Sequence, residues 1–149
     1  MNHFLESIKT LLAEAYTGTQ TQSWFSDHGA DSGLFATLEK ISAEDASRKI
    51  GHSSIAAHTN HLRWSLAMSN ALMRGQPASR NWVESWEVQS VTVEEWTELK
   101  SHLRLEYERL ITQLPNGFDP NNPMMTTVGI SLVAHAAYHL GAIRQMAIS

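Results

Sequence analysis

The chain has 149 residues, no cysteine and a formal net charge of −4 with its eight histidines counted as neutral. This length suits a single domain, residues 1–149, and charged residues make up only 17% of it without the dense basic patch expected of a nucleic-acid-binding protein. The absence of cysteine excludes disulfides, thiolate metal sites and cysteine nucleophiles, so any metal must bind to His, Asp or Glu.

The first predicted element is an amphipathic helix that ends near Gly18. Its apolar residues follow the three- and four-residue spacing of one helix face: Phe4, Leu5, Ile8, Leu11, Leu12, Ala15 and Tyr16. Glu6 and Lys9 interrupt the apolar pattern, so we expect no secretory signal and a cytoplasmic location. Residues 26–33 are expected to form a loop, followed by one or two short helical turns in which Ser42 and Asp45 have the spacing of a capping box.

A second long helix is predicted from Ser53 or Ser54 to about Arg74. The connector after it, residues 77–91, contains Trp82 and Trp86. Two tryptophans are poorly suited to remain in water, so we expect this connector to fold back against the helices.

The third predicted helix begins with a capping box of Thr92 and Glu95 and ends at residues 115–117, Pro-Asn-Gly. The fourth is predicted from Thr126 or Thr127 almost to the C-terminus. The uncharged stretch 120–143 is as long as a membrane span of ~20 residues, but its Asn, Thr, His and Gly residues indicate a buried helix, so no membrane association is expected. Four long helices with these connectors predict an all-α fold, a four-helix bundle.

Two histidines occur one helical turn apart in the fourth predicted helix. His135 and His139 project from the same face, and Leu132 on that stripe indicates that the face is buried. Neutral imidazoles at this spacing can bind one divalent metal ion. The spacing suits equally well two core histidines that are only hydrogen-bonded.

The second predicted helix directs two more histidines, His58 and His61, toward the interior. A helical projection places both on its apolar side. The opposite, polar side carries Asn60, Arg63, Asn70 and Arg74. Helix bundles build metal sites from inward-facing side chains of facing helices, and three histidines with an open position for water are typical of a catalytic site. Two clusters of merely hydrogen-bonded histidines are the alternative.

No other reactive group suggests a second site. The remaining histidines occur where exposure to solvent is expected: His3, His28, His52 and His102. The sequence has no Ser–His–Asp arrangement, no glycine-rich phosphate loop and no pair of E-x-x-H segments of the di-iron type. Tyr138 is expected to pack against neighbouring side chains, and Arg144 to be solvated or to meet an anionic substrate.

Three motifs carry a resemblance to a known family. They are S-I-x-x-x-x-x-H-L-x-W at residues 54–64, N-W-x-x-S-W at 81–86 and H-A-A-Y-H-L-G-A-I-R-Q at 135–145. With them the chain resembles, over essentially its whole length, the DinB/YfiT superfamily of four-helix-bundle metalloproteins, whose helices run up-down-down-up. The resemblance implies that His61, His135 and His139 bind a divalent metal ion, Zn or Ni. The helical projection places His58 nearer the middle of the buried face, but His61 is the residue that matches the family motif. We therefore expect His58 to orient one of the ligands without binding the metal itself.

The resemblance implies a chemistry only in outline. Members of the superfamily are thiol S-transferases and isomerases that use low-molecular-weight thiols, so a metalloenzyme acting on small molecules is expected. The alternatives are a non-catalytic stress-related or interaction protein whose metal is structural, and a bundle without metal. The superfamily commonly forms homodimers, and Trp82 and Trp86, or the apolar stripe of the first helix, would supply the contacts.

Overall fold

The computed structural model describes residues 2–78 and 81–149, which form helices, turns and loops without a named strand. The long helices are α1 (His3–Thr17), α4 (Ile55–Met73), α5 (Val93–Gly117) and α6 (Pro123–Ala147). The short ones are α2 (Leu34–Glu39), α3 (Ala43–Ser47) and the 3₁₀ turns η1 (Ala30–Ser32) and η2 (Glu84–Trp86). The prediction of an all-α fold is confirmed, and η1 lies within the segment predicted as loop.

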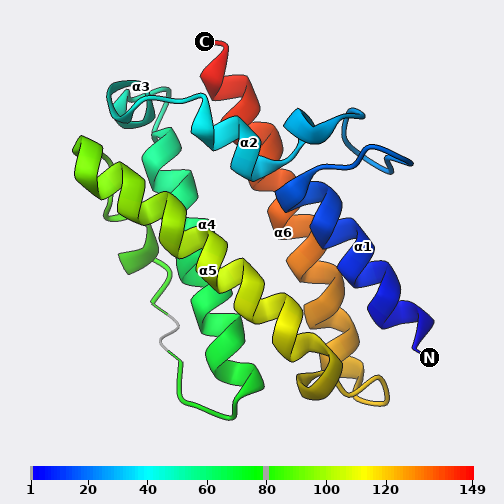
Figure 1. Ribbon diagram of the computed structural model, residues 1–149. Helices are drawn as coiled ribbons and strands as arrows, with labels where there is room; N and C mark the ends of the chain where they lie inside the picture. Colours follow the sequence, from blue (N-terminus) through cyan, green and yellow to red (C-terminus); the bar gives the residue numbers. More distant parts are fainter. Residues whose placement is uncertain (1, 79–80) are drawn as a thin grey trace.

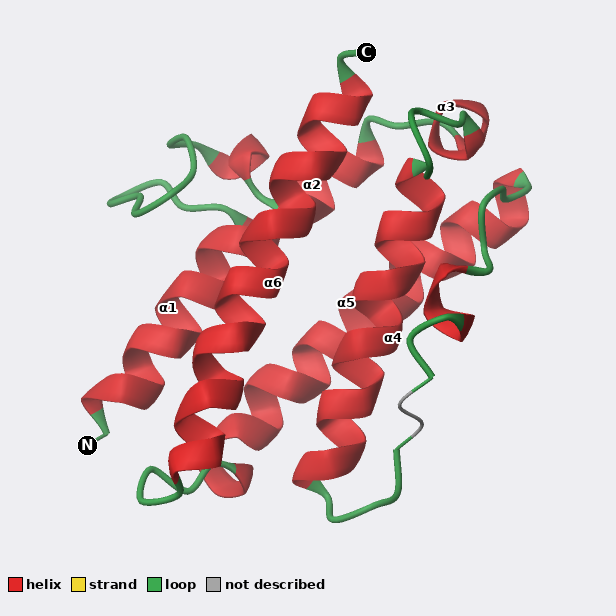
Figure 2. Ribbon diagram, turned by 180° about the vertical axis from the view of Figure 1, so that it is seen from behind, coloured by secondary structure: helices red, strands yellow, loops and turns green. Residues whose placement is uncertain are grey.

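The long helices pack as neighbouring pairs. α1 lies beside α6, α4 lies beside α5, and α4 also contacts α6 (Figures 1 and 2). In Figure 1 the chain rises through α1, descends through α4 and again through α5, and rises through α6 to the C-terminus. Because α4 and α5 run in the same direction, the chain between them must travel back alongside α4.

The helix ends follow from their capping residues. The side chain of Ser54 accepts a hydrogen bond from Ala57 N, and Thr92 and Glu95 form the predicted reciprocal capping box. The predicted start of α6 at Thr126 or Thr127 is wrong. α6 begins at Pro123, because the Asn122 side chain accepts from Met124 N at 3.0 Å and proline favours the first helical position.

The apolar stripe of α1 lies in the core. Leu5, Ile8 and Leu12 are buried, in a helix that packs along α6. This stripe, one of the two surfaces that the sequence offered for a dimer contact, is therefore buried within the chain itself.

The predicted polar side of α4 is also covered. Asn60 and Asn70 are buried because the connector and α5 lie over that side. Asn60 Nδ2 donates to the Ser85 carbonyl at 2.9 Å, and Asn70 Nδ2 donates to the Glu106 carbonyl at 2.9 Å. A helical projection counts such asparagines as exposed, although buried amides are stable where they are hydrogen-bonded.

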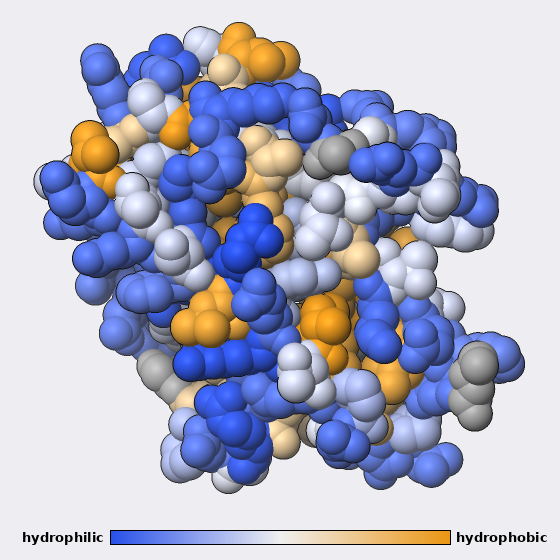
Figure 3. All heavy atoms as spheres, viewed as in Figure 1, coloured by the Kyte–Doolittle hydropathy of each residue, from blue (hydrophilic) through white to orange (hydrophobic). Residues whose placement is uncertain are grey.

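Hydrophilic residues cover most of the face shown in Figure 3, and the hydrophobic ones there occur in separate small groups. Among the described residues, no helix combines the length and the apolar character that crossing a membrane requires. The long, nearly uncharged α6 instead contributes Leu132, Leu140 and Ile143 to the core.

Gly129 allows α6 to approach its neighbours closely. A Cβ atom at this position would lie 3.2 Å from Phe4 Cε1 and 3.3 Å from Phe118 Cε2. Those two rings stack with centroids 5.7 Å apart. The small residue thus helps to fix the position of α6, the helix that carries His135 and His139.

We expect Gly129→Leu to lower the free energy of unfolding by about 1–3 kcal/mol, because the added side chain overpacks the contact with the two phenylalanines. At Gly141, on the same helix, a Cβ atom would have no neighbouring atom within 4 Å. The matched variant Gly141→Leu should therefore raise stability by up to about 0.8 kcal/mol through helix propensity. Urea denaturation of both variants checks this, and equal effects at the two sites would contradict it.

Candidate metal centre

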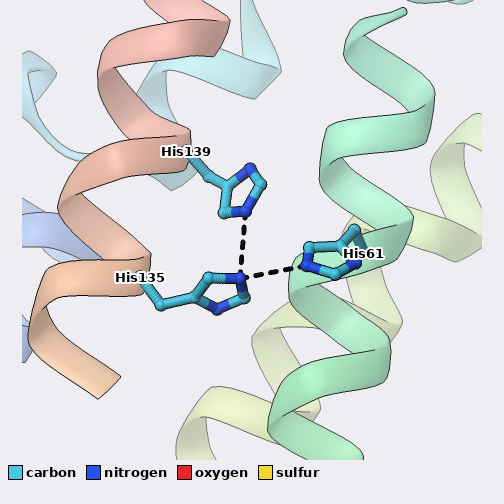
Figure 4. Close-up of side chains that lie close together, drawn as sticks. All are labelled: His61, His135 and His139. Atoms are coloured by element: carbon cyan, nitrogen blue, oxygen red, sulfur yellow. Dashed lines mark hydrogen bonds between the residues drawn. The ribbon is translucent and has the colours of Figure 1, made fainter. Parts of the chain in front are cut away.

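Three histidines from two helices meet between α4 and α6. His61 projects from α4, and His135 and His139 project from α6, with their rings turned toward one another (Figure 4). Nε2 of His135 lies 3.0 Å from Nε2 of His61 and 3.0 Å from Nε2 of His139. A ligand nitrogen from each residue lies within 4.8 Å of the other two, so this group could hold a metal ion.

The group is largely shielded from water. Only 4% of His61 and 2% of His139 is exposed, whereas His135 is half-buried. The four-residue spacing on α6 places both of its rings on the face that turns toward α4, as the sequence predicted. His135 therefore lies on the side of the group that is closest to solvent.

The imidazoles are neutral near pH 7. Burial lowers the pKa of His61 to about 4, and the neighbouring His135 and His58 add to this effect. Burial lowers the pKa of His139 still further, and charge repulsion from His135, His58 and His61 adds to this effect. Burial also lowers the pKa of His58 and of His135. Neutral imidazole is the form that binds a metal ion.

Hydrogen bonding alone leaves the group incompletely satisfied. In a neutral ring, Nε2 of His135 carries either one proton or one lone pair, yet it faces two ring nitrogens at 3.0 Å. Zn–N distances of about 2.0–2.1 Å in a tetrahedral site separate two ligand nitrogens by roughly 3.3 Å. Small side-chain rotations would reach that separation, so the donor set fits a divalent ion.

His58 lies next to the group rather than within it. Its Nδ1 is 2.8 Å from Nδ1 of His139, the ring nitrogen that points away from the other two histidines. A residue that orients a ligand occupies this kind of position. His61, and not His58, is thus the residue of α4 that lies in the group of three.

The connector between α4 and α5 covers the group. We call residues 81–91 the return segment, because they carry the chain back along α4. Trp86 stacks on His61 with ring centroids 4.3 Å apart, and Ser54 Oγ donates to the Gln89 carbonyl at 2.6 Å. The expectation that this connector folds back is confirmed, although residues 79 and 80 lie outside the described residues and 48% of Trp82 is exposed.

The other residues that the sequence singled out lie away from the group, with one exception. The four remaining histidines are exposed, as predicted: His3, His28, His52 and His102. Arg144 pairs with Asp27 at 2.6 Å. Tyr138 packs edge-on against His139, with ring centroids 4.9 Å apart, although 68% of it is exposed.

Sequence reasoning did not identify Ser85 as part of the site. Its side chain is fully buried, and its Oγ lies 2.7 Å from Nδ1 of His61. The only signal was its place in the motif N-W-x-x-S-W at residues 81–86.

A scan against protein-family models and searches of curated proteins and of solved structures found no match to this chain.

The metal-free protein should lose stability in mild acid. Unfolded histidine binds a proton near pH ~6.5, whereas folded His61 binds one only near pH 4. Below pH ~6.5 the unfolded chain thus binds more protons, and the free energy of unfolding should fall by up to about 1.4 kcal/mol per pH unit for each of His61 and His139.

Urea denaturation in the presence of chelator, between about pH 7 and about pH 5, measures this dependence. His61→Asn keeps an N–H donor near the position of Nδ1 but cannot titrate, so its dependence on pH should be shallower. An identical slope in this variant would show that His61 is not held neutral by the fold.

Proposed function

We propose that His61, His135 and His139 bind one divalent metal ion, Zn or Ni, and leave a coordination position open for a further ligand. The convergence of three neutral imidazole nitrogens around one point carries this proposal. Three protein ligands and an open position are typical of catalytic rather than structural zinc sites.

We further propose that the chain is a four-helix bundle of the DinB/YfiT type with up-down-down-up topology. The directions of α1, α4, α5 and α6 in Figure 1 support this topology. The origin of the histidines, one from α4 and an H-x-x-x-H pair from α6, supports the family assignment together with the sequence motifs.

The reaction that we propose is the transfer of a low-molecular-weight thiol to a small electrophile. When bound, the metal ion would lower the pKa of a coordinated thiol and so supply a thiolate at neutral pH. The three histidines hold their nitrogens in place, and the burial of His61 and His139 restricts water at that side of the site.

The aromatic rings at the exposed side of the site would contact the substrate. The Tyr138 ring lies 4.9 Å from that of His139, and the Trp82 ring lies 6.5 Å from that of His135. Both are partly open to solvent beside the half-buried His135. Such rings offer apolar contact to a small molecule that approaches the open position.

A structural metal in a non-catalytic protein is the second candidate. The burial of His61 under the stacked Trp86 ring favours it, because structural ions are commonly shielded from solvent. For either function we propose a homodimer in the cytoplasm, with the exposed Trp82 and Val83 as contact residues.

Metal content should separate the ligands from His58. We expect about one ion per chain in protein purified without an affinity tag, and loss of the ion in His61→Ala, His135→Ala and His139→Ala, since a three-ligand site has no spare donor. His58→Ala should retain most of the metal. Elemental analysis of the four variants measures this directly. Loss in His58→Ala with retention in His61→Ala would instead identify His58 as the ligand.

The bound ion should also stabilise the fold. At a free metal concentration of about one hundred times Kd, preferential binding to the folded state contributes about 2.7 kcal/mol. For a chain of this size that raises the melting temperature by roughly 5–10 °C. Thermal denaturation before and after chelation, and again after addition of Zn or Ni, tests this. An unchanged melting temperature throughout would contradict a folded-state metal site.

Metal-loaded protein should accelerate the attack of a low-molecular-weight thiol on an epoxide, halide or maleyl-type acceptor. Metal-free protein and metal-treated His135→Ala are the controls, because both retain the chain but lack the loaded site. Rates of thiol consumption that are equal in all three samples would rule out the transferase and leave the structural role.

A further inference from the structure

Ser85 joins His61 to the return segment through two short contacts. Its Oγ lies 2.7 Å from Nδ1 of His61 and 2.6 Å from the carbonyl oxygen of Trp82. Both distances are within the range of strong hydrogen bonds. The side chain is fully buried, so no solvent competes for either contact.

The hydroxyl proton of Ser85 can serve only one of these contacts. A carbonyl oxygen is an acceptor without a proton, so the 2.6 Å approach of Oγ to the Trp82 carbonyl requires the hydroxyl to donate there. Oγ then meets Nδ1 of His61 with a lone pair, and Nδ1 must be the donor. In neutral His61 the lone pair is consequently on Nε2, the atom 3.0 Å from His135.

The backbone around Ser85 holds this arrangement in place. Asn60, next to His61 on α4, donates from Nδ2 to the Ser85 carbonyl at 2.9 Å. The Trp86 ring, the next residue along, stacks on His61 with an angle of 17° between the rings. The hydroxyl, the backbone and the ring of this turn therefore all contact His61 or its neighbour.

His139 lacks an equivalent constraint. Its Nδ1 faces Nδ1 of His58 at 2.8 Å, and either ring can donate in that pair. The contact with His58 therefore does not fix the proton position on His139, whereas Ser85 determines that on His61.

We infer that Ser85 is a positioning residue that keeps His61 in the Nδ1–H tautomer and so presents the Nε2 lone pair to the site. The tautomer follows from the contacts of the metal-free chain. Its consequence for metal affinity rests on the proposed function. Outer hydrogen bonds of this kind typically change metal affinity about 10–100-fold.

Long-range ¹H–¹⁵N correlation spectra of metal-free protein labelled at histidine report the tautomer of His61 directly. We expect the Nδ1–H form in the wild type and a mixture containing the Nε2–H form in Ser85→Ala. Zn affinity, measured by competition with a chromophoric chelator, should fall about tenfold in Ser85→Ala. Ser85→Thr retains the hydroxyl and should restore both properties.

Ser47→Ala is the matched control for general loosening of the return segment. Ser47 Oγ accepts from Val91 N at 2.9 Å, so this variant also removes a contact of the segment but touches no histidine. Its tautomer and Zn affinity should match the wild type, even if its melting temperature falls.

An Nε2–H tautomer in the wild type would overturn the inference, as would unchanged tautomer and affinity in Ser85→Ala. A wild-type protein that binds neither Zn nor Ni would refute the proposed function instead. The tautomer spectra of the metal-free protein would still decide the role of Ser85 in that case.

Discussion

The parallel packing of α4 against α5 constrains where the rest of the chain can lie. Two neighbouring helices that run in the same direction cannot be joined by a short turn, so the chain must return along α4 before α5 begins. The return segment follows this path and places η2 against His61. The surroundings of that histidine are thus a consequence of helix order, and the facing pair on α6 completes the group across the α4–α6 contact.

The absence of carboxylates from the histidine group determines its electrostatics. Neutral imidazoles cost much less to bury than charged side chains, so the core tolerates the group without a compensating ion. A divalent ion held by neutral donors keeps its full positive charge. That charge would favour an anionic further ligand, which is the form in which a thiol reacts.

The features that could be predicted from sequence were those set by local periodicity. Capping residues and the 3.6-residue repeat determine α1, α4 and α5, and the i, i+4 spacing of His135 and His139 predicts their common direction. What could not be predicted depends on contacts between elements. Asn60 is buried because the return segment covers it, and the 68% exposure of Tyr138 depends on how the neighbouring elements pack beside α6.

The choice between His58 and His61 shows the same limit. One helix projection contains no information about which neighbour approaches from which angle, and the two residues differ by less than one turn. Ser85 is more difficult still, since its role depends on a backbone carbonyl of its own turn and on a histidine of a different helix. The two tryptophans indicated that the segment folds back, but only its place in the motif marked Ser85 itself.

The return segment can open locally without unfolding of the helices beneath it. It is attached to the helices by side-chain hydrogen bonds at a few points, including those of Ser47, Ser54 and Asn60, and Val83 within it is largely exposed. Segments of this kind open at a lower free energy than the global unfolding of the helices beneath them. Because His61 is buried beneath this segment, we expect its ring proton to exchange with solvent through such a local opening. Substitutions in residues 81–91 can therefore change the kinetics of access to the centre while the equilibrium stability of the helical core stays the same.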